Sequence, residues 1–378
     1  MFRVVSTVSP SPAASDEKRL LEAARGGDEG AFQGLVEPRR RELHAHCYRM
    51  LGSVHDAEDA LQETMLRAWK GLAKFEGRSS LRSWLYTIAT NTCLNAIERR
   101  PKRVLPVDYG PATDPHDGPG NPLVEEVWIE PYPDEKLGVE DGLAGPEARY
   151  EQREAVELAF IAALQTLPAN QRAVLILREV LGYSAKEVAT SLETSVASVN
   201  SALQRARKTV EERTPDQSQQ ETLRQLGEDG VRKAVEDYVE AWQRGDVDEV
   251  VSLLSEEASF SMPPMSTWYR GREGIATWMG RSPLSGDFKW KPVLTQANGQ
   301  PTLAYYSWDP EENAYVPFAL NVLSFDERGE IEDVTAFIVR SSQDPDPEVQ
   351  AQTPYQPADY GKLADVYGRF GLPPKLED

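Results

Sequence analysis

The sequence has few of the residues from which disulfide frameworks and membrane spans are built. Only 2 cysteines occur in 378 residues. Cys47 and Cys93 both lie inside helical patterns, so we expect buried thiols in a reducing cytoplasm and no disulfide. No apolar run approaches the roughly 18 residues that a transmembrane helix needs. The apolar stretch within residues 1–10 is too short for a secretory signal. These shortages predict a cytoplasmic protein without a membrane anchor.

Histidine is equally scarce, with 4 in the chain. His44, His46 and Cys47 crowd together in one predicted helix, but no matching cluster occurs elsewhere. Structural zinc normally takes four ligands, so we interpret the three residues as part of a helix face. The sequence predicts no metal site and no cofactor.

Basic residues are fewer than acidic ones, with 41 Lys and Arg against 61 Asp and Glu, and the formal net charge is −20. That balance argues against nucleic-acid binding, which depends on attraction to phosphates. The distribution of the charges along the chain removes this objection to nucleic-acid binding. Residues 31–103 hold about thirteen Lys or Arg against eight Asp or Glu, whereas residues 104–150 hold about two against eleven. The acidic residues are therefore segregated from a basic N-terminal part.

That basic part contains two predicted helices joined by a short loop. Residues 53–70 carry apolar side chains at three- and four-residue spacing, and Ser53 begins the helix. After the loop 74–80, a second helix runs over residues 81–97 and ends in a cationic cluster, residues 99–103. A polar stripe follows its exposed side at four-residue steps: Thr87, Asn91, Asn95 and Arg99. Amides, hydroxyls and cations in this order suit base edges and phosphates.

The run 52–64, followed by residues 75–91, resembles region two of the extracytoplasmic-function (ECF) sigma factors of the sigma-70 family. The resemblance implies that the first helix docks on core RNA polymerase and that the loop and second helix melt and capture the promoter minus-ten element. The implied polymerase-binding residues are Asp56, Glu58, Asp59, Gln62, Glu63 and Arg67. The implied DNA-binding residues are Arg78, Ser80, Arg82, Tyr86, Thr87, Asn91, Asn95, Arg99, Arg100, Lys102 and Arg103. The loop from Phe75 to Ser80, with Asn91, is the candidate pocket for a flipped base.

Residues 104–149 lack helical periodicity and are rich in Pro, Gly and Asp, so we interpret them as an acidic linker. The resemblance implies that this linker threads the polymerase RNA channel. One apolar island, residues 127–134, interrupts it. Its Trp128 and Tyr132 indicate a segment that docks on a partner or a neighbouring domain, with a local hydrophobic cluster as the alternative.

Residues 150–213 return to strong helical periodicity and contain a helix-turn-helix pattern. Ser184 and Glu187 form a capping box before the first helix, and the second begins at Ser195. The segment resembles region four of the same family, which reads the minus-thirty-five element. It departs from the common pattern at Glu193, Asn200 and Ala202. The candidate DNA-binding residues are Thr194, Ser195, Ser198, Asn200, Ser201, Gln204, Arg205 and Lys208.

A polar bridge, residues 214–227, leads to a third domain in which two helices precede a strand meander, an α+β order. We expect Asp246 to cap the second of these helices. Residues 238–251, 260–265 and 269–275 resemble the SnoaL-like cone. Its candidate pocket residues, which could instead fill a core, are Phe260, Met262, Trp268, Tyr269, Trp278, Tyr306 and Trp308. All four histidines lie outside this domain, so an Asp/His dyad is impossible and we predict no catalysis. A small hydrophobic ligand remains a possible partner.

The expected order is a tail (1–15), a region-two helical domain (16–103), the linker (104–149), a region-four helix-turn-helix domain (150–213), the bridge (214–227), a SnoaL-like α+β domain (228–342) and a tail (343–378). An aromatic island at 367–374 could dock the last domain onto the DNA-binding part. The predicted function is an RNA polymerase sigma factor with a fused regulatory domain that contacts the sigma regions. Alternatives are a small-molecule-sensing helix-turn-helix regulator without a polymerase role, or an isomerase or cyclase with a DNA-binding appendage.

Overall fold

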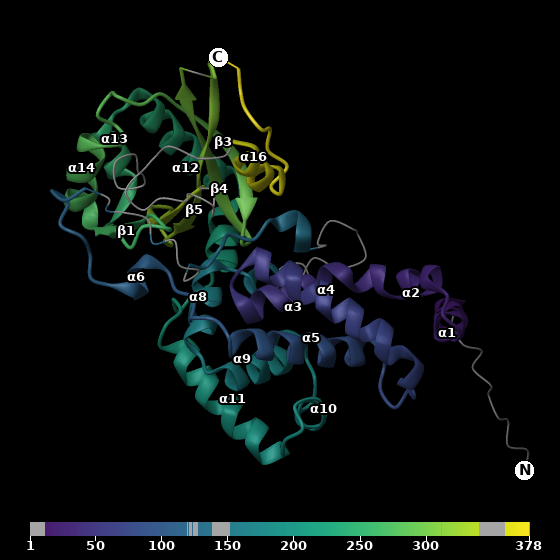
Figure 1. Ribbon diagram of the computed structural model, residues 1–378. Helices are drawn as coiled ribbons and strands as arrows, with labels where there is room; N and C mark the ends of the chain where they lie inside the picture. Colours follow the sequence, from purple (N-terminus) through teal and green to yellow (C-terminus); the bar gives the residue numbers. More distant parts are fainter. Residues whose placement is uncertain are drawn as a thin grey trace, which may run out of the picture.

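The computed structural model describes residues 12–118, 120, 123, 128–137, 152–310, 312–339 and 360–377. Parts of the predicted tails and linker therefore lie outside the described residues. Two helical bodies lie side by side beneath a third body built on a curved sheet (Figure 1).

The first helical body is formed by α1 (Pro12–Arg25), α2 (Glu29–Val36), α3 (Arg40–Leu51), α4 (Val54–Gly71) and α5 (Leu81–Ile97). The 3-10 turn η1 (Glu37–Arg39), which contains Pro38, separates α2 from α3. A second turn, η2 (Leu72–Lys74), follows α4. Ser53 and Ser80 accept hydrogen bonds from the backbone at Asp56 and Ser83, which fixes the starts of α4 and α5.

The second helical body comprises α8 (Leu158–Thr166), α9 (Ala169–Leu175), the π-helical turn η4 (Ile176–Val180), α10 (Ala185–Ser191) and α11 (Val196–Glu211). The predicted capping box of Ser184 and Glu187 is present at the start of α10. In the chain, the linker connects the two bodies. Its described residues include the helix α6 (Pro106–Tyr109) and the turn η3 (Asp134–Leu137).

The third body begins with α12 (Gln219–Arg244), so half of the predicted bridge is helical. Ser218 caps this helix, and Gly227, at φ 72° and ψ 162°, bends it. The other elements are α13 (Val247–Ser252), β1 (Leu254–Ser261), β2 (Trp268–Arg270), α14 (Gly271–Arg281), β3 (Trp290–Ala297), β4 (Gln300–Asp309), β5 (Ala314–Phe325), β6 (Ile331–Ile338) and α16 (Tyr360–Gly368). Asp246 caps α13, as predicted.

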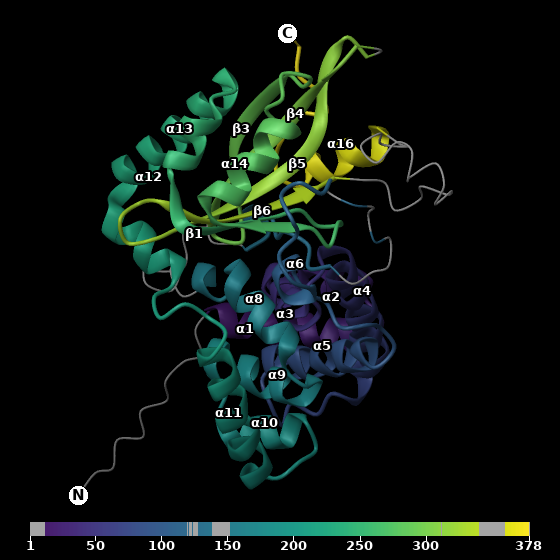
Figure 2. The same ribbon diagram turned by 90° about the vertical axis from the view of Figure 1, so that its left-hand side faces the viewer.

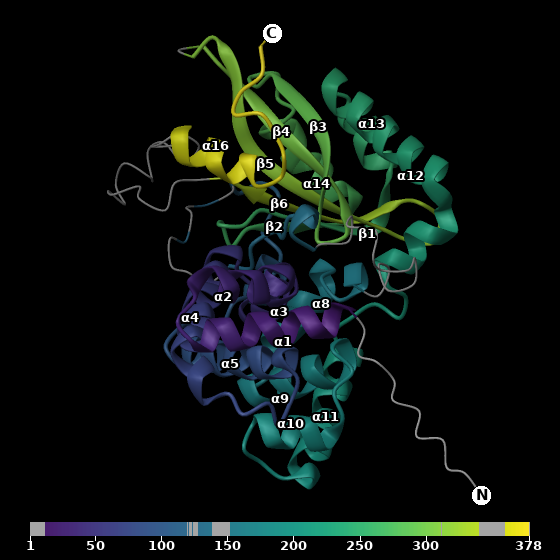
Figure 3. The same ribbon diagram turned by 90° about the vertical axis from the view of Figure 1, so that its right-hand side faces the viewer.

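The six strands form one sheet in the order β2-β1-β6-β5-β4-β3. Strands β3 to β6 form an antiparallel meander, of which β3 was not predicted. Strand β1 pairs with β6 in parallel, so the sheet is mixed. Helices α12 to α14 cover one face, here called the inner face, and α16 lies on the other, outer face (Figures 2 and 3). The inner face encloses a core of its own, whereas apolar residues of the outer face belong to the same core as both helical bodies. The three bodies are thus joined by one continuous apolar cluster.

Candidate nucleic-acid interface

The polar stripe of α5 is only partly accessible. Asn91, Asn95 and Arg99 are exposed. Thr87 is half-buried, and its hydroxyl oxygen lies 2.8 Å from that of Ser191 in α10. Three of the four stripe residues therefore face solvent, while the fourth contacts the second helical body.

The loop before α5 presents charged and small side chains and hides its aromatic residue. Phe75 is buried against Trp84, with ring centroids 4.9 Å apart. Residues 76–80 are exposed, and Arg78 pairs with Glu76. Because Trp84 covers the Phe75 ring, this part of the candidate base pocket is closed in the structure.

Tyr86 departs from its predicted place beside the bases. Its side chain is 1% exposed and lies between α3 and α5, where its hydroxyl donates to Glu42 over 3.2 Å. Arg82 donates to the same carboxylate over 2.8 Å and stacks on the Tyr86 ring. Burial also raises the pKa of Tyr86. Glu42 of α3, 40 to 44 residues earlier in the chain, thus holds both Arg82 and Tyr86, and the Tyr86 ring is buried where the sequence placed it beside the bases.

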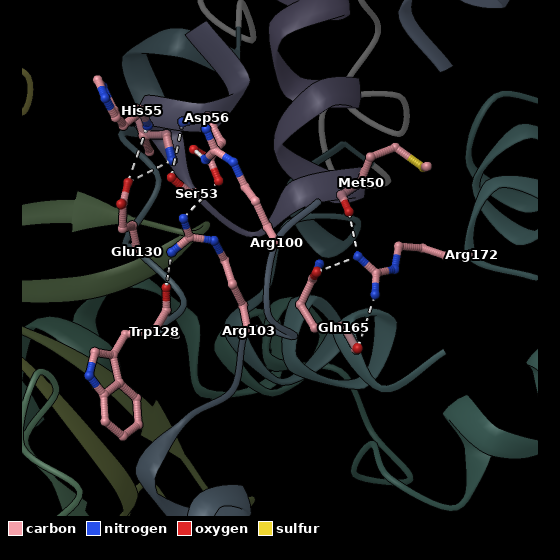
Figure 4. Close-up of polar contacts among 11 residues, drawn as sticks. Met50, Ser53, His55, Asp56, Arg100, Arg103, Trp128, Glu130, Gln165 and Arg172 are labelled. Carbon is pink, nitrogen blue, oxygen red and sulfur yellow. Dashed lines mark hydrogen bonds and ion pairs between the residues drawn. The ribbon is translucent and has the colours of Figure 1, made fainter. Parts of the chain in front are cut away.

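The cationic cluster after α5 folds back on the first turn of α4 (Figure 4). Arg103 is 7% exposed and donates to the Asp56 carboxylate over 2.7 Å and to the carbonyl of Trp128 over 2.6 Å. Arg100 also pairs with Asp56, which is 3% exposed. Lys102 is exposed. Asp56, predicted to contact polymerase, and Arg103, predicted to contact DNA, therefore bind each other inside the structure.

The other residues of α4 that were predicted to bind polymerase lie on its outer side and are exposed or half-buried. Asp59 and Gln62 are exposed, and Glu63 accepts a hydrogen bond from Arg67 over 2.6 Å. Glu58 is half-buried and lies 3.6 Å from Arg40 and 3.7 Å from Lys136 of the linker. This surface combines both charge signs, and Leu66 on it is 55% exposed.

Helices α10 and α11 form the predicted helix-turn-helix. Glu193 has a φ of 50°, the left-handed conformation in which glycine is favoured, at the position where the family pattern has glycine. Val199, Leu203 and Ala206 bury one side of α11. Val196, in the first turn of α11, is 42% exposed. The eight candidate DNA contacts are all exposed: Thr194, Ser195, Ser198, Asn200, Ser201, Gln204, Arg205 and Lys208.

The two helical bodies are joined by buried polar contacts. Arg172 of α9, 4% exposed, donates to the carbonyl of Met50 and to both oxygens of Gln165 (Figure 4). Gln165 in turn donates to the carbonyl of Arg49 over 3.2 Å, and Arg49 donates to the carbonyl of Ala155 over 3.0 Å. The end of α3 is thus fixed to the start of the second body.

The linker island docks on the first body, as predicted. The Glu130 carboxylate accepts hydrogen bonds from the backbone of Val54 (2.8 Å) and His55 (3.2 Å), at the positive end of α4. Tyr132 is fully buried, and its hydroxyl is 2.8 Å from Nδ1 of His44. Trp128 is 7% exposed.

Two buried histidines lie close to this contact. Burial lowers the pKa of His44 to about 4, and burial with the nearby Arg49 lowers that of His46 to about 3. His46 bonds to Thr90 over 2.9 Å. Both rings are therefore neutral at pH 7 and serve as hydrogen-bonding core residues.

The hairpin turn between β3 and β4 connects all three bodies with the linker. The Asn298 amide donates to the Tyr48 hydroxyl (2.9 Å) and to the Val156 carbonyl (2.8 Å) and accepts from the Tyr132 backbone (2.8 Å). Asn298 is fully buried and has a φ of 57°. Sequence reasoning missed this residue, although an Asn-Gly dipeptide between two strands is a strong hairpin signal.

Further contacts on both sides of this turn hold the third body in place. The backbone of Gly299 donates to Asp134 over 2.8 Å, and Leu158 donates to the Gln300 side chain over 2.9 Å. Glu157 accepts from the backbone of Gln219 and Gln220, at the start of α12. Burial raises the pKa of Glu157 to about 7.

The C-terminal aromatic island docks on its own domain. Tyr367 is fully buried on the outer face of the sheet, where its hydroxyl donates to the carbonyls of Tyr305 and Ala319. Leu376 pairs with Tyr315 as an isolated bridge. The hydrogen bonds of this island go to β3, β4 and β5, while Tyr367, Phe370 and Leu372 belong to the apolar cluster shared with the helical bodies. That the island docks the last domain onto the DNA-binding part stays a prediction.

Only three of the seven predicted pocket residues line the cavity on the inner face: Phe260, Met262 and Trp278. Trp268 and Tyr269 bond to linker carbonyls at Gly110 and Asp117. Tyr306 points to the outer face because neighbouring strand residues alternate, and its hydroxyl donates to Pro373. Trp308 packs on Tyr315.

Comparisons with known proteins agree with this architecture. The model of Sigma-70 region 2 matches residues 35–103, that of Sigma-70, region 4 matches residues 151–210, and that of the SnoaL-like domain matches residues 235–334. No described helix is long and apolar enough to cross a membrane.

Relatives were found among curated proteins and solved structures. The ECF RNA polymerase sigma factor SigG of Mycobacterium tuberculosis is 42% identical over 332 residues, covering 84% of this chain and 86% of that protein. The RNA polymerase sigma-H factor of Pseudomonas aeruginosa is 28% identical, covering 52% of this chain and 92% of its own. The crystal structure of the Mycobacterium tuberculosis sigma factor SigJ covers 85% of this chain and 99% of its own, with 20% identity and a TM-score of 0.48.

Proposed function

Since the chain belongs to the ECF sigma factors of the sigma-70 family, we propose that the structure is the closed, resting form of this RNA polymerase sigma factor. In this form the SnoaL-like domain holds the two DNA-binding domains together. The partners are core RNA polymerase and promoter DNA, and the place of action is the cytoplasm. The exposed residues of α4, α5 and α11 supply the contacts.

The geometry of the promoter supports this proposal. The minus-ten and minus-thirty-five elements are about 25 base pairs apart, or roughly 85 Å at about 3.4 Å per pair. In the structure, the hydroxyl oxygens of Thr87 in α5 and of Ser191 in α10, the helix just before the reading helix α11, are 2.8 Å apart. The two reading helices cannot contact both elements in this arrangement, so the domains have to separate on the polymerase.

The observation that carries the proposal is the position of Asn298. One side chain of the third domain bonds to the first body, to the linker and to the start of the second body. Any separation of these parts breaks some of those bonds. The energy of opening therefore depends directly on the SnoaL-like domain.

We infer that this domain regulates by binding and carries out no catalysis. The cavity on its inner face is lined by apolar, aromatic and neutral polar side chains, with neither a carboxylate nor a histidine among them. General acid–base chemistry most often uses such a group. Tyrosine can also serve, but burial holds the pKa of Tyr305 in this lining well above its usual value, so its hydroxyl is not a ready base. The alternative of a free-standing small-molecule regulator is not favoured, because residues 35–103 match Sigma-70 region 2.

Run-off transcription tests the proposal. Purified core polymerase is combined with the full chain, with residues 1–213, or with Asn298→Gly, on a selected promoter library. Glycine keeps the positive φ and removes three hydrogen bonds, each worth about 1 kcal/mol, so we expect at least about tenfold more promoter-specific transcript at limiting factor.

Asn313→Gly is the matched control, because Asn313 also has a positive φ (46°) in a hairpin but is exposed. Its transcript level should equal that of the natural chain. Equal output from the natural chain, Asn298→Gly and residues 1–213 on every promoter would contradict the regulatory role. Absence of transcript and of core binding in all of them would contradict the polymerase role.

A further inference from the structure

The two cysteines of the chain meet inside the first helical body. Cys47 of α3 and Cys93 of α5 are both fully buried, and their thiols are hydrogen-bonded to each other. Neither side chain takes part in the proposed contacts with polymerase or DNA. In a reducing compartment, a pair of neighbouring thiols that can close to a disulfide is typical of transient, redox-sensing chemistry. The pair is therefore a candidate site of oxidation.

The packing of α3 on α5 brings the two thiols together. Glu42 of α3 bonds to Tyr86 of α5, and four residues further along both helices His46 bonds to Thr90. The two helices therefore run in the same direction with matched steps of about one turn. The cysteines follow the second of these contacts by one residue on α3 and by three on α5. They lie on the line along which the helices touch, so two helices hold the pair in place and no loop is involved.

A buried cation, Arg172 of α9, lies beside this pair. In the described part of the chain its hydrogen bonds all go to neutral carbonyl or amide oxygens, including those of Met50 and Gln165 (Figure 4). Its Nε has no hydrogen-bond partner among the described residues. The titratable group that acts on Arg172 is Cys93. A cation beside a cysteine stabilises the thiolate, which is the reactive form, so Cys93 is the thiol that reacts first.

We propose that Cys47 and Cys93 are a modification site at which a peroxide converts the two thiols into an intramolecular disulfide between α3 and α5. With hydrogen peroxide, the Cys93 thiolate attacks one oxygen, the O–O bond breaks, and the departing hydroxide takes up the Cys93 proton and leaves as water. The Cys47 sulfur then attacks the sulfur of the Cys93 sulfenic acid. An S–S bond forms, and the S–O bond breaks as the hydroxyl leaves with the Cys47 proton as a second water. Two electrons pass from the sulfurs to the peroxide.

The closed form protects this site. Burial and the contact with Cys47 raise the pKa of Cys93, while Arg172 acts in the opposite direction, so little thiolate is present. Tyr132 of the linker lies within electrostatic reach of Cys47. Separation of the domains under the proposed function moves Tyr132 and Arg172 away from the pair and lets peroxide reach it. The site itself does not depend on the proposed function; only its protection in the closed form rests on that proposal.

The test treats the reduced full chain, without polymerase, with hydrogen peroxide and maps its peptides by mass spectrometry without reduction. We expect one intramolecular disulfide between Cys47 and Cys93 that dithiothreitol reverses. This peptide map of the natural chain needs no variant. Cys47→Ala should stop at a sulfenic acid on Cys93, which dimedone traps, whereas Cys93→Ala should react at least about tenfold more slowly. Circular dichroism verifies that both variants are folded.

The rate of disulfide formation supplies the second readout. Asn298→Gly should form the disulfide at least about tenfold faster than the natural chain, and Asn313→Gly should form it at the natural rate. Absence of the disulfide from both the natural chain and Asn298→Gly would overturn the proposal. So would disulfides that form only between chains, or a single oxidised cysteine that never pairs.

Two further outcomes separate this proposal from the proposed function. More transcript from Asn298→Gly, at an unchanged oxidation rate, would overturn the protection of the site by the closed form. A Cys47 to Cys93 disulfide in the natural chain, with equal transcript from the natural chain, Asn298→Gly and residues 1–213, would establish the site and contradict the regulatory role.

Discussion

Asp56 is the residue whose place in the structure differs most from its place in the sequence pattern. In the pattern it is an acidic residue in the first turn of a helix, where the helix dipole favours it. In the structure Arg100 and Arg103 enclose it. Its carboxylate therefore balances two cations, and the start of α4 depends on residues 44 and 47 positions further along the chain.

Replacing this carboxylate should be costly. Asp56→Ala leaves buried Arg103 without its counter-ion, and breaking a buried pair from one side typically costs about 3–5 kcal/mol. We expect a loss of that size in the free energy of unfolding measured with urea. Asp59→Ala, one turn further along α4 and exposed, is the control and should change little. Similar stability of both variants would show that Arg103 is solvated.

Glu157 makes stability depend on pH in a defined direction. Its pKa is raised from 4.5 to about 7 in the fold, so its contribution is fully present below pH 4.5 and is lost as the pH rises to about 7. Glu332 is raised to about 7 in the same direction. His44, lowered from 6.5 to about 4, acts oppositely: its contribution is present above pH 6.5 and is lost as the pH falls to about 4.

Glu157→Gln isolates the first of these effects. The amide remains neutral, so the melting temperature of the variant should fall less than that of the natural chain between pH 4.5 and 7. Parallel melting curves for the two proteins over this range would contradict the raised pKa. Glu154→Gln, close in sequence and only half-buried, is the matched control.

At the scale of elements, α11 presents its polar residues outward in the closed form. Arg205 donates to Ser201 over 2.7 Å and is otherwise directed to solvent on the exposed side of the helix. A single phosphate contact contributes about one unit to the salt dependence of DNA affinity. The recognition helix can therefore be tested one cation at a time.

We expect Arg205→Ala to weaken promoter binding by the assembled polymerase and to lower the slope of log affinity against log salt by about one. The measurement is a filter-binding titration at several salt concentrations. Arg232→Ala, at an exposed position of α12, is the control and should leave the slope unchanged. An unchanged slope for Arg205→Ala would remove this residue from the interface.

The sequence predicted those elements whose signals are local. Ser53, Ser184 with Glu187, and Asp246 cap helices through bonds within four residues, so the pattern alone found them. Strand β3 was missed, and with it the Asn298 turn, because the partners of that turn lie at Tyr48, Tyr132 and Val156. Tertiary partners also buried Tyr86. That the exposed residues of α4, α5 and α11 contact polymerase and DNA is still a prediction. Arg205→Ala tests it for α11.

At the scale of the whole molecule, the linker acts as a bound strap and not as a loose tether. Its first part meets the third domain, where Thr113 donates to the carbonyl of Trp268 and Trp268 to that of Gly110. Its second part joins the first body at Glu130 and Tyr132. The described linker residues thus contact domains that precede and follow them in the chain.

The third domain is covalently joined to the sigma regions, so the amount of one always equals the amount of the other, whatever the level of gene expression. Only residues 212–218 separate α11 from α12. Under the proposed closed resting form, each sigma unit is therefore synthesised with its own inhibitor at a fixed ratio of one to one. Dilution cannot release such an inhibitor, because its effective concentration is set by the chain. A cell that doubles expression doubles the closed and open forms alike. Output should then rise in proportion to expression, without the threshold that a separately encoded inhibitor creates by titration.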